Sequence, residues 1–482
     1  MICNIIYYIT KELECKDEKL KMFFWAELMK VHNNIFLINN SNNWYLTWLF
    51  LDLTISNCYD KIKSNLDCHK RRTAMKYIPR ELERKFMQMN GFFKAVLVTG
   101  ARQVGKTTML KRLAEGTNRT YISLDNIMAR ELAQTDPDLF FQTYKPPVLI
   151  DEVQYAPQLF ERIKILCDET DETGLFWLTG SQQYSMMKNV RESLAGRVGI
   201  LTLYSLSQRE KAGIKFEEPL TFSLEGLRER QAVMPENNIN DVFEHIWRGG
   251  MPHVQYADAE QRQEYYNSYI DTYLLRDAAE AGGITDSLKF IKFLRTCAAL
   301  TAEQVNYASL ANASDISEPV AKNWLKILEG LGIIYLLQPY SNNEFKRLTK
   351  TPKLYFCDTG LCAYLSMWLT KDTLMNGAAS GHYYENYVVT ELLKSYAYSK
   401  TKANLSYYRD SNAKEIDVFV ETDGLIHPLE IKKSASPDRR EVKKYELLDK
   451  ASVPRGSGGI VCMCGEPVPI DDKNCFIPSN LI

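Results

Sequence analysis

The sequence predicts an α/β protein with a parallel sheet flanked by helices, a winged helix-turn-helix, and a second, smaller α/β domain. Three observations indicate this. Short apolar runs alternate with helical patterns between residues 76 and 240. Three helical patterns followed by two short strands occupy residues 287–358, and an amphipathic helix followed by three strands begins at Gly381.

Length and composition set the outer limits. The chain has 482 residues, 45% of them hydrophobic and 25% charged, which is typical of a soluble protein of about three domains. A net charge of −1 gives no global basic field for nucleic acid. The 11 cysteines have no repeated spacing, which favours reduced thiols, and the longest apolar run, Trp44–Ile55, is too short to cross a bilayer. We therefore expect a cytoplasmic protein without a membrane partner.

Residues 1–74 have no period that defines helices or strands. The pattern changes at Met75, and Pro79 opens an amphipathic helix that runs toward Met89. We expect residues 1–74 to be either the product of an upstream start or a poorly ordered extension.

Five short apolar runs are expected to form the first sheet. They are Ala95–Thr99, Tyr121–Leu124, Val148–Ile150, Leu175–Thr179 and Gly199–Leu203. Helical patterns separate them, so the strands should be parallel.

A glycine-rich loop follows the first of these strands. Its pattern is Gly100-x-x-x-x-Gly105-Lys106-Thr107, and a helical pattern comes directly after it. In this context backbone N–H groups wrap a phosphate at a helix N-terminus, the lysine reaches the β- and γ-phosphates, and the threonine hydroxyl ligates Mg²⁺. A chance glycine loop before a helix is the alternative. The pattern predicts ATP and Mg²⁺ as cofactors.

Two carboxylates end the third predicted strand. Asp151 and Glu152 follow the apolar run Val148–Ile150, and open α/β sheets bind ligands at the carboxyl ends of their strands. We expect Asp151 to hold the Mg²⁺ through a water molecule and Glu152 to orient and deprotonate the attacking water. Two solvated acids at a strand exit are the simpler alternative.

Polar residues after the fourth strand complete the predicted site. Ser181 or Gln182 is placed to sense the γ-phosphate, and Arg197 is placed to supply charge to the transition state, in its own subunit or a neighbouring one. An arginine that pairs with surface acids is nearly as good an interpretation. The residues expected around the nucleotide are Gly100, Ala101, Arg102, Gln103, Val104, Gly105, Lys106, Thr107, Thr108 and Ser181.

These motifs, with Leu149–Gln154, Leu178–Gln182 and Leu194–Arg197, together resemble the AAA+ ATPase domain of a bacterial and archaeal family of ATPases. The resemblance covers roughly residues 76–480 and implies an AAA+ P-loop sheet. It assigns Lys106, Thr107, Asp151 and Glu152 to ATP and magnesium. It also implies a C-terminal domain related to restriction-type nucleases.

Residues 241–282 are expected to be a helical connector. Gly249-Gly250 and Pro252 mark a turn, and a tyrosine-rich helical stretch ends in Arg276-Asp277. The family has a similar corner and Arg-Asp pair. The segment is expected to transmit nucleotide state, with plain packing as the alternative.

Residues 283–377 are expected to form the winged helix-turn-helix. Its third helix begins near Pro319 and carries Lys322, Asn323 and Lys326, which could meet a DNA groove. Many winged helices bind only protein, and this helix has no strong basic excess, so both interpretations stay open.

The last domain, residues 378–482, carries a second set of ionisable residues. Glu385 lies on a helix, Asp417 on a strand, and Glu430 and Lys432 on one face of a later strand. Carboxylates that share Mg²⁺ and a lysine that polarises water suit phosphodiester hydrolysis. The pattern resembles the PD-(D/E)XK nuclease superfamily, which would make Asp417, Glu430 and Lys432 the core residues and Glu385 a further metal ligand. Surface ion pairing between Glu430 and Lys432 is the alternative.

The sequence thus predicts an extension (1–74), an AAA+ P-loop ATPase domain (75–240), a connector (241–282), a winged helix (283–377) and a nuclease-like domain (378–482). The expected function is ATP hydrolysis coupled to binding or metal-dependent cleavage of DNA or RNA. The first rival is a nucleotide-controlled switch or scaffold that captures a protein partner. The second is a regulator that binds DNA without catalysis. The chain could also form a homo-oligomer, in which Arg197 of one subunit would act on the nucleotide of a neighbouring subunit.

Overall fold

The computed structural model describes residues 77–180, 193–282, 284, 286–340, 351–410, 412, 414–450 and 453–482. The chain divides into two units, Met1–Tyr77 and Ile78–Ile482, and almost every described residue belongs to the second. The predicted extension of residues 1–74 and the predicted nucleotide sensors Ser181 and Gln182 lie outside the described residues.

The first part of the second unit is a five-stranded sheet with its helices. In chain order the elements are α4 (Leu82–Asn90), β1 (Ala95–Thr99), α5 (Lys106–Ala114), β2 (Thr120–Ser123), α6 (Ile127–Thr135), α7 (Pro137–Thr143), β3 (Val148–Asp151), η1 (Val153–Tyr155), α8 (Leu159–Asp168), β4 (Phe176–Thr179) and β5 (Val198–Thr202). All neighbouring strands are parallel, in the order β2-β3-β4-β1-β5. This confirms the predicted parallel α/β sheet.

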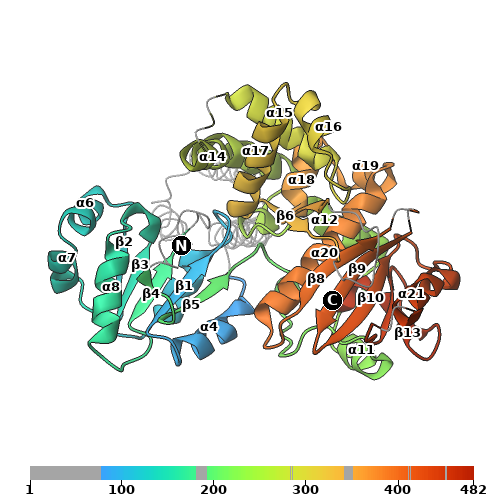
Figure 1. Cartoon of the computed structure of the whole chain (residues 1–482), viewed down its shortest axis with the longest axis horizontal. Helices are drawn as coiled ribbons and strands as arrows, with labels where there is room; N and C mark the ends of the chain where they lie inside the picture. Colours follow the sequence, from blue (N-terminus) through green and yellow to red (C-terminus); the bar gives the residue numbers. More distant parts are fainter. Residues whose placement is uncertain are drawn as a thin grey trace, which may run out of the picture. The chain divides into compact units, whose positions relative to one another are not determined.

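Both faces of the central strands β1, β3 and β4 are buried, which is why these strands are mostly apolar. Alternate residues of β1 enter different cores. Val96 and Val98 pack with residues of α4 and α5, whereas Ala95 and Leu97 pack with residues of α6, α7 and α8. Helices α6, α7 and α8 are seen beside β2 and β3 in the blue-green part of Figure 1.

The middle of the chain is helical. Its elements are α10 (Gln208–Ala212), α11 (Leu224–Gln231), α12 (Ile239–Arg248), η2 (His253–Tyr256), α13 (Ala259–Tyr269), the π-helix η3 (Ile270–Leu274), α14 (Leu275–Gly282), α15 (Ser287–Ala299), α16 (Tyr307–Ala313), α17 (Glu318–Gly330), β6 (Ile334–Leu337), β7 (Lys353–Phe356), α18 (Thr359–Leu365) and α19 (Lys371–Asn376). Strands β6 and β7 pair antiparallel. Three helices followed by two strands are therefore present in the order that the sequence predicts.

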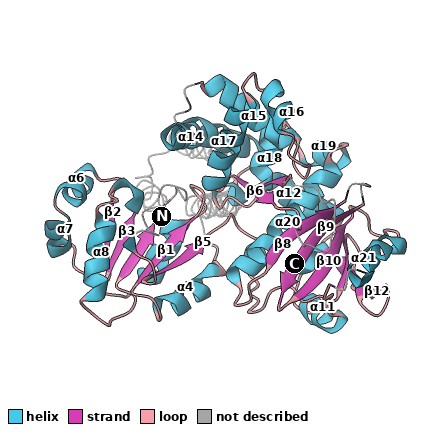
Figure 2. Cartoon of the chain, in the orientation of Figure 1, coloured by secondary structure: helices cyan, strands magenta, loops and turns pink. Residues whose placement is uncertain are grey.

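The C-terminal part is a second sheet with helical segments. Its elements are α20 (Ser380–Tyr398), β8 (Asn404–Arg409), β9 (Glu415–Thr422), β10 (Leu425–Ile431), η4 (Arg439–Tyr445), α21 (Glu446–Lys450), β11 (Gly458–Cys462), β12 (Val468–Pro469), β13 (Asn474–Pro478) and η5 (Ser479–Leu481). The six strands lie in the order β12-β13-β11-β10-β9-β8. Figure 2 shows strands of this sheet in magenta and α20 in cyan. The β8–β10 part is antiparallel, and β10, β11 and β13 run parallel.

The two faces of the second sheet also enter separate cores. Leu429 and Ile431 of β10 belong to the large core that includes the apolar residues of α20. Ile426 and Ile460 instead pack with Tyr445 of η4 and other residues on that side. The sheet is therefore covered by α20 on one face and by η4 and α21 on the other.

No helix among the described residues is long and apolar enough to span a membrane.

Helix α12 carries His245, whose side chain is half-buried and lines a small pocket with Lys211 and Glu391. The helix packs against α18, α19 and α20. Burial, helped by the positive charge of Lys211, lowers the pKa of His245 from 6.5 to about 4. Between pH 6.5 and 4 the imidazole of His245 is protonated in the unfolded chain but neutral in the folded chain. Its contribution to the free energy of unfolding therefore falls as the pH falls through this range.

We predict that His245→Gln reduces the acid sensitivity of the fold. The free energy of unfolding of the parent should fall by up to about 1.4 kcal/mol per pH unit more steeply than that of the variant in this window. Urea unfolding at several pH values measures the difference. His382→Gln, at an exposed position of α20, is the matched control. Parallel pH profiles of His245→Gln and the parent would contradict the prediction.

Candidate functional site

The loop after β1 has the backbone of an anion-binding turn. Gly100 and Gly105 have φ values of 139° and 99°, which favour glycine. A Cβ on Gly100 would lie 2.1 Å from the carbonyl oxygen of Leu203, so a side chain there would clash. Helix α5 begins at Lys106, directly after Gly105, and its N-terminal N–H groups face the loop. This arrangement fits a phosphate group.

Lys106 lies buried inside the loop. Its Nζ donates hydrogen bonds to the carbonyl oxygens of Gly100 and Ala101, at 2.9 and 2.8 Å. Burial lowers the pKa of this lysine to about 8. A desolvated ammonium group is stabilised by a nearby anion, so Lys106 suits a phosphate ligand.

The predicted magnesium residues lie together. The Thr107 hydroxyl donates to Asp151 Oδ1 at 2.8 Å, and the Tyr121 hydroxyl donates to Asp151 Oδ2 at 3.2 Å. The Thr179 hydroxyl also donates to Asp151 Oδ1. A hydroxyl and a carboxylate in contact beside a phosphate loop are the oxygen ligands that Mg²⁺ takes. These residues therefore fit a nucleotide-bound magnesium ion.

Glu152 follows Asp151 in an unusual backbone conformation, with φ 56°. This left-handed conformation turns the chain sharply at the end of β3. The backbone N–H of Glu152 donates to Thr179 Oγ1 at 3.2 Å, its Oε1 lies 3.6 Å from Arg102 Nη1, and Gln154 Nε2 donates to its Oε2. The carboxylate is thus held in one place at the carboxyl edge of the sheet.

Arg102 is the side chain of the loop with the most polar contacts to other elements. Its Nε donates to Asp277 Oδ2 on α14, and its Nη2 donates to the Tyr155 hydroxyl at 3.3 Å. Burial alone would lower the pKa of Arg102, but the hydrogen bond to Asp277 and the charges of Glu152 and Asp277 hold it above its ordinary value. The predicted pair Arg276-Asp277 thus contacts the phosphate loop through Asp277.

Arg197 lies at the other edge of the sheet. Its carbonyl oxygen accepts a hydrogen bond from the N–H of Ala95, the first residue of β1, whereas the phosphate loop follows the last. Its guanidinium donates to both carboxylate oxygens of Asp168, at 2.6 and 3.0 Å. The structure therefore excludes the prediction that Arg197 acts on the nucleotide of its own subunit.

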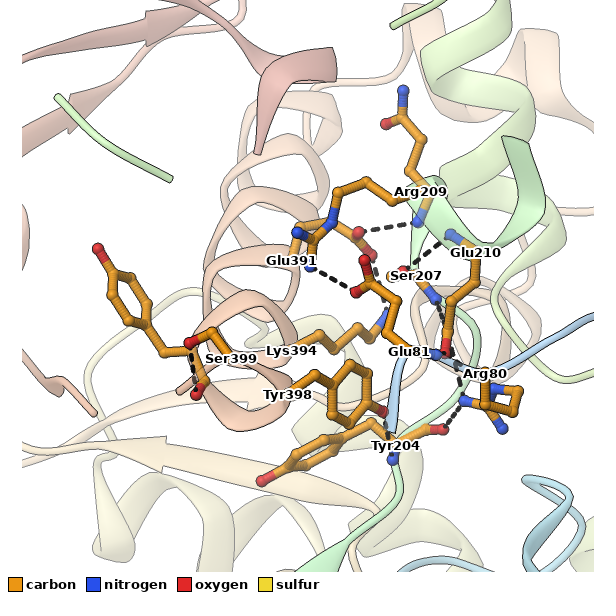
Figure 3. A network of polar contacts seen from close by, with 12 residues as sticks. Arg80, Glu81, Tyr204, Ser207, Arg209, Glu210, Glu391, Lys394, Tyr398 and Ser399 are labelled. Carbon is orange, nitrogen blue, oxygen red and sulfur yellow. Dashed lines mark hydrogen bonds and ion pairs between the residues drawn. The ribbon is translucent and has the colours of Figure 1, made fainter. Parts of the chain in front are cut away.

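A buried polar network, drawn in Figure 3, contacts the phosphate loop through Arg80. Arg80 Nη1 donates to the carbonyl oxygen of Val104 at 2.6 Å, and Arg80 Nε donates to Glu210 Oε1 at 3.0 Å. Glu210 is part of the capping box with Ser207 that starts α10. The side chains of Arg80 and Glu210 are 2% and 0% exposed. The loop carbonyl is therefore held by an ion pair that water does not reach.

The same network continues to α20. The backbone N–H of Gln208 donates to Glu391 Oε2 at 2.9 Å, and Lys394 Nζ donates to Glu391 Oε1 at 2.9 Å and to the carbonyl oxygen of Leu206 at 3.2 Å. The Tyr398 hydroxyl accepts from the N–H of Tyr204, in the segment that follows β5. The phosphate loop and α20 are thus connected by buried hydrogen bonds.

The turn between α17 and β6 also reaches the loop. A Cβ on Gly332 would lie 3.2 Å from the backbone nitrogen of Ala101. A cavity of about 120 Å³ lies between this turn, the loop and the segment after β5. The middle of the chain therefore contacts the phosphate loop directly.

The predicted C-terminal residues fall into two ion-pair groups. In the first, Lys353 Nζ lies 2.9 Å from Glu385 Oε1, 2.5 Å from Glu415 Oε1 and 3.9 Å from Asp417 Oδ1. The Tyr355 hydroxyl donates to Glu385 Oε1 at 2.7 Å. Burial and the charge of Asp417 raise the pKa of Glu385, despite Lys353.

The second group surrounds Glu430. Lys432 Nζ lies 2.6 Å from Glu430 Oε1, and Lys444 Nζ lies 2.5 Å from Glu430 Oε2. Burial and the charge of Asp417 raise the pKa of Glu430. Asp417 itself is fixed by the backbone N–H of Ile431, which donates to its Oδ2 at 2.8 Å.

An irregularity in β9 places Asp417. Ser406 pairs with Phe419 and Tyr408 with Ile416, so β9 has one residue more than β8 between these pairs. An extra residue of this kind re-aims the side chains around it. Asp417 thereby acts electrostatically on both Glu385 and Glu430. Among the described residues, however, no three His, Cys, Asp or Glu side chains are grouped so as to hold a metal ion.

Sequence reasoning missed Thr179, Arg80 and Lys353. Thr179 ends β4, which the sheet order inserts between β1 and β3, so its contact with Asp151 depends on the strand order. Arg80 and Lys353 are buried charged residues, 2% and 3% exposed. Their partners are distant in sequence, and no local spacing pointed to them.

Three stretches of the chain match known families. Residues 92–212 match an AAA domain, residues 239–372 match a domain of unknown function (DUF8612), and residues 380–482 match a second domain of unknown function (DUF4143). The first match holds the phosphate loop, Asp151 and Glu152. Residues 92–212 are therefore an ATPase-like AAA domain, which confirms the AAA part of the resemblance.

Two curated relatives extend over most of the chain. "Uncharacterized protein Rv2008c" of Mycobacterium tuberculosis is 27% identical over 357 residues, which are 73% of this chain and 74% of the relative. "Uncharacterized protein MJ1637" of Methanocaldococcus jannaschii is 25% identical over 344 residues, which are 65% of this chain and 70% of the relative.

Solved structures give weaker similarities. The Walker-type ATPase PABY2304 of Pyrococcus abyssi is 14% identical, with a TM-score of 0.39, over 60% of this chain and 95% of that one. The RuvB Holliday junction branch migration motor of Thermotoga maritima is 17% identical, with a TM-score of 0.26, over 56% of this chain and 88% of that one.

We predict that Arg80→Ala destabilises the fold and weakens nucleotide binding. The change leaves the Glu210 carboxylate buried without its ion-pair partner, which should lower the free energy of unfolding by about 3–5 kcal/mol. It also frees the Val104 carbonyl, so the phosphate loop loses a support. Chemical unfolding and titration with an ATP analogue measure the two effects.

Arg84→Ala is the matched control, since Arg84 lies one turn later and its bond to Glu217 is exposed. That change should cost less than about 1 kcal/mol. Equal destabilisation by the two substitutions would contradict the assigned role of Arg80.

Proposed function

We propose that this chain binds ATP with Mg²⁺ and hydrolyses it. The observation that carries the proposal is the contact between Thr107 and Asp151, with the buried Lys106 beside them, at the carboxyl edge of the AAA sheet. A hydroxyl, a carboxylate and a desolvated lysine around glycine-rich backbone are the parts that nucleotide-triphosphate chemistry needs.

Each residue has a role in this proposal. The N–H groups of Gly100–Thr108 and the Lys106 ammonium hold the phosphates, and Thr107 and Asp151 provide the ligands of the metal. Bound Mg²⁺ offsets charge that develops on the phosphate oxygens. Glu152 accepts the proton of the attacking water as the bond from water oxygen to the γ-phosphorus forms and the bond to the β-phosphate oxygen breaks. Thr179 fixes Asp151 and Glu152 relative to each other. Ser181 stays a proposed γ-phosphate contact.

Arg197 keeps a proposed role only between subunits. Its ion pair with Asp168 is exposed, with the two side chains 32% and 50% accessible, so a neighbouring copy could reach it. In a homo-oligomer the arginine would stabilise the transition state in the adjacent site.

The second part of the proposal is that ATP turnover is coupled to nucleic acid. Helices α15, α16 and α17 with the β6–β7 hairpin have the element order of a winged helix. Lys322 on α17 is half exposed and pairs with Glu318 at 2.8 Å. Together with Asn323 and Lys326 it would approach DNA or RNA; a protein partner on the same helix is the rival.

A metal-dependent nuclease site is the second candidate function. The observation that favours it is that Asp417, Glu430 and Lys432 lie at one end of neighbouring strands, with Glu385 joined to Asp417 through Lys353. Glu385, Asp417 and Glu430 would bind Mg²⁺, and Lys432 would polarise the water. Binding would require Lys353 and Lys444 to release these carboxylates.

We predict that Lys106→Ala abolishes ATP binding, whereas Glu152→Gln binds ATP and holds it. The first change removes the phosphate cation; the second keeps the shape of the side chain but removes the proton acceptor, so turnover should fall by at least about 10²-fold. Equilibrium binding of ATP and single-turnover release of phosphate measure the two effects. Equal turnover by Glu152→Gln and the parent would remove Glu152 from its role.

For the nuclease site we predict Mg²⁺- or Mn²⁺-dependent nicking that Lys432→Ala abolishes while ATP turnover persists. Supercoiled plasmid, single-stranded DNA and RNA serve as substrates. Lys443→Ala, on the neighbouring segment η4, is the control for general loss of positive charge. A parent protein that cuts none of these substrates would favour the switch or scaffold, in which the C-terminal domain captures a protein partner.

A further inference from the structure

The phosphate loop places one arginine beside the proposed catalytic acid. Arg102 Nη1 lies 3.6 Å from Glu152 Oε1, and the Arg102 side chain is 10% exposed. Four charged side chains interact electrostatically with the buried Lys106, and they therefore lie in one region around it. They are Glu152, Arg102, Asp151 and Asp277. Since Glu152 activates the water in the proposed function, the group beside it lies at the terminal-phosphate end of the site.

The guanidinium has capacity for a further acceptor. Its Nε donates to Asp277 and its Nη2 donates to the Tyr155 hydroxyl, and these are its only hydrogen bonds within the part of the chain that the structure describes. A guanidinium has five N–H groups, so three remain, and they point from a planar, rigid fork. A phosphate oxygen can accept from Nη1 and Nη2 while Nε stays on Asp277.

Asp277 holds this fork in position. Its side chain is 5% exposed, and its other oxygen lies 3.5 Å from Arg276 Nε. It belongs to the first turn of α14, directly after the π-helix η3, whose Tyr273 ring centre lies 5.9 Å from the Arg102 guanidinium carbon. Helix α14 packs in turn against η3 and α17. The position of Asp277 is therefore fixed by the helical part of the chain.

We infer that Arg102 binds the terminal phosphate of ATP and that Asp277 is the positioning residue that orients it. The inference rests on the proposed ATPase function and extends it. Residues 92–212 match the AAA domain, whereas Asp277 belongs to the stretch that matches a different family, residues 239–372. The catalytic site is thus completed by a residue from outside the AAA domain, and the helical part controls the turnover rate through it.

The charges make this role specific for a triphosphate. Asp277 and Glu152 offset the positive charge of Arg102 over longer distances. ADP, which lacks the terminal phosphate, should therefore gain little binding free energy from this arginine. Loss of the orienting carboxylate should leave ADP binding unchanged, because ADP is held by the loop amides and Lys106. The terminal phosphate of ATP, and the transition state above all, should lose a fixed donor.

The test uses the full chain with Asp277→Asn and Arg102→Lys. Asp277→Asn keeps the shape but removes the charge that orients Nε, and kcat should fall about tenfold, the size typical of a partner that orients a site residue. Arg102→Lys keeps the charge but loses the planar fork, and kcat should fall about 100-fold. In both variants the preference for ATP over ADP should fall while affinity for ADP stays within about twofold of the parent.

Asp271→Asn is the control, because Asp271 is an exposed acid in the adjacent π-helix. It should match the parent in kcat and in both affinities. A parallel loss of ADP and ATP affinity in the two test variants would show a purely structural role and overturn the inference. Unchanged kcat and unchanged ATP-over-ADP preference would overturn it as well. A parent that binds no nucleotide would instead refute the proposed function.

Discussion

The hydrogen bond between Thr107 and Asp151 is the contact on which the site depends. It joins the start of α5 to the end of β3, although β4 lies between β1 and β3 in the sheet. The contact forms because all five strands are parallel, so their carboxyl ends share one edge. Thr179, at the end of the intervening strand β4, forms hydrogen bonds with Asp151 and with the backbone N–H of Glu152. The strand order therefore determines the geometry of the proposed magnesium site.

The loop is not an isolated module. Arg80 holds the Val104 carbonyl, Asp277 holds Arg102, and the turn before β6 contacts Ala101. These supports come from before the AAA match and from the stretch after it. Buried ion pairs contribute little net stability compared with apolar packing, yet losing one partner is costly, so they fix one arrangement of the chain. The loop is thereby connected by direct contacts to the helical part of the chain.

Much of the fold could be predicted from the sequence because its signals are local. The central strands of the first sheet, β1, β3 and β4, are mostly apolar runs of four or five residues, and the glycines around Lys106 stand where positive φ is needed. The placement of Arg197 was also within reach, because this residue precedes β5 and so must lie at the amino edge, away from the loop. Asp277, Arg80 and Lys353 were not predictable as site residues, since their partners are brought near only by tertiary packing. The irregularity that places Asp417 has no local sequence signature either.

The central claim is that the glycine-rich loop binds the phosphates of ATP. Amide hydrogen exchange of the full chain, with and without ATP and Mg²⁺, tests it most directly because it reads the backbone N–H groups themselves. We predict slower exchange in the peptides that cover residues 100–108 and 148–152, and no such effect with Lys106→Ala. Unchanged exchange in both peptides at saturating ATP, or slower exchange only in other parts of the chain, would contradict it.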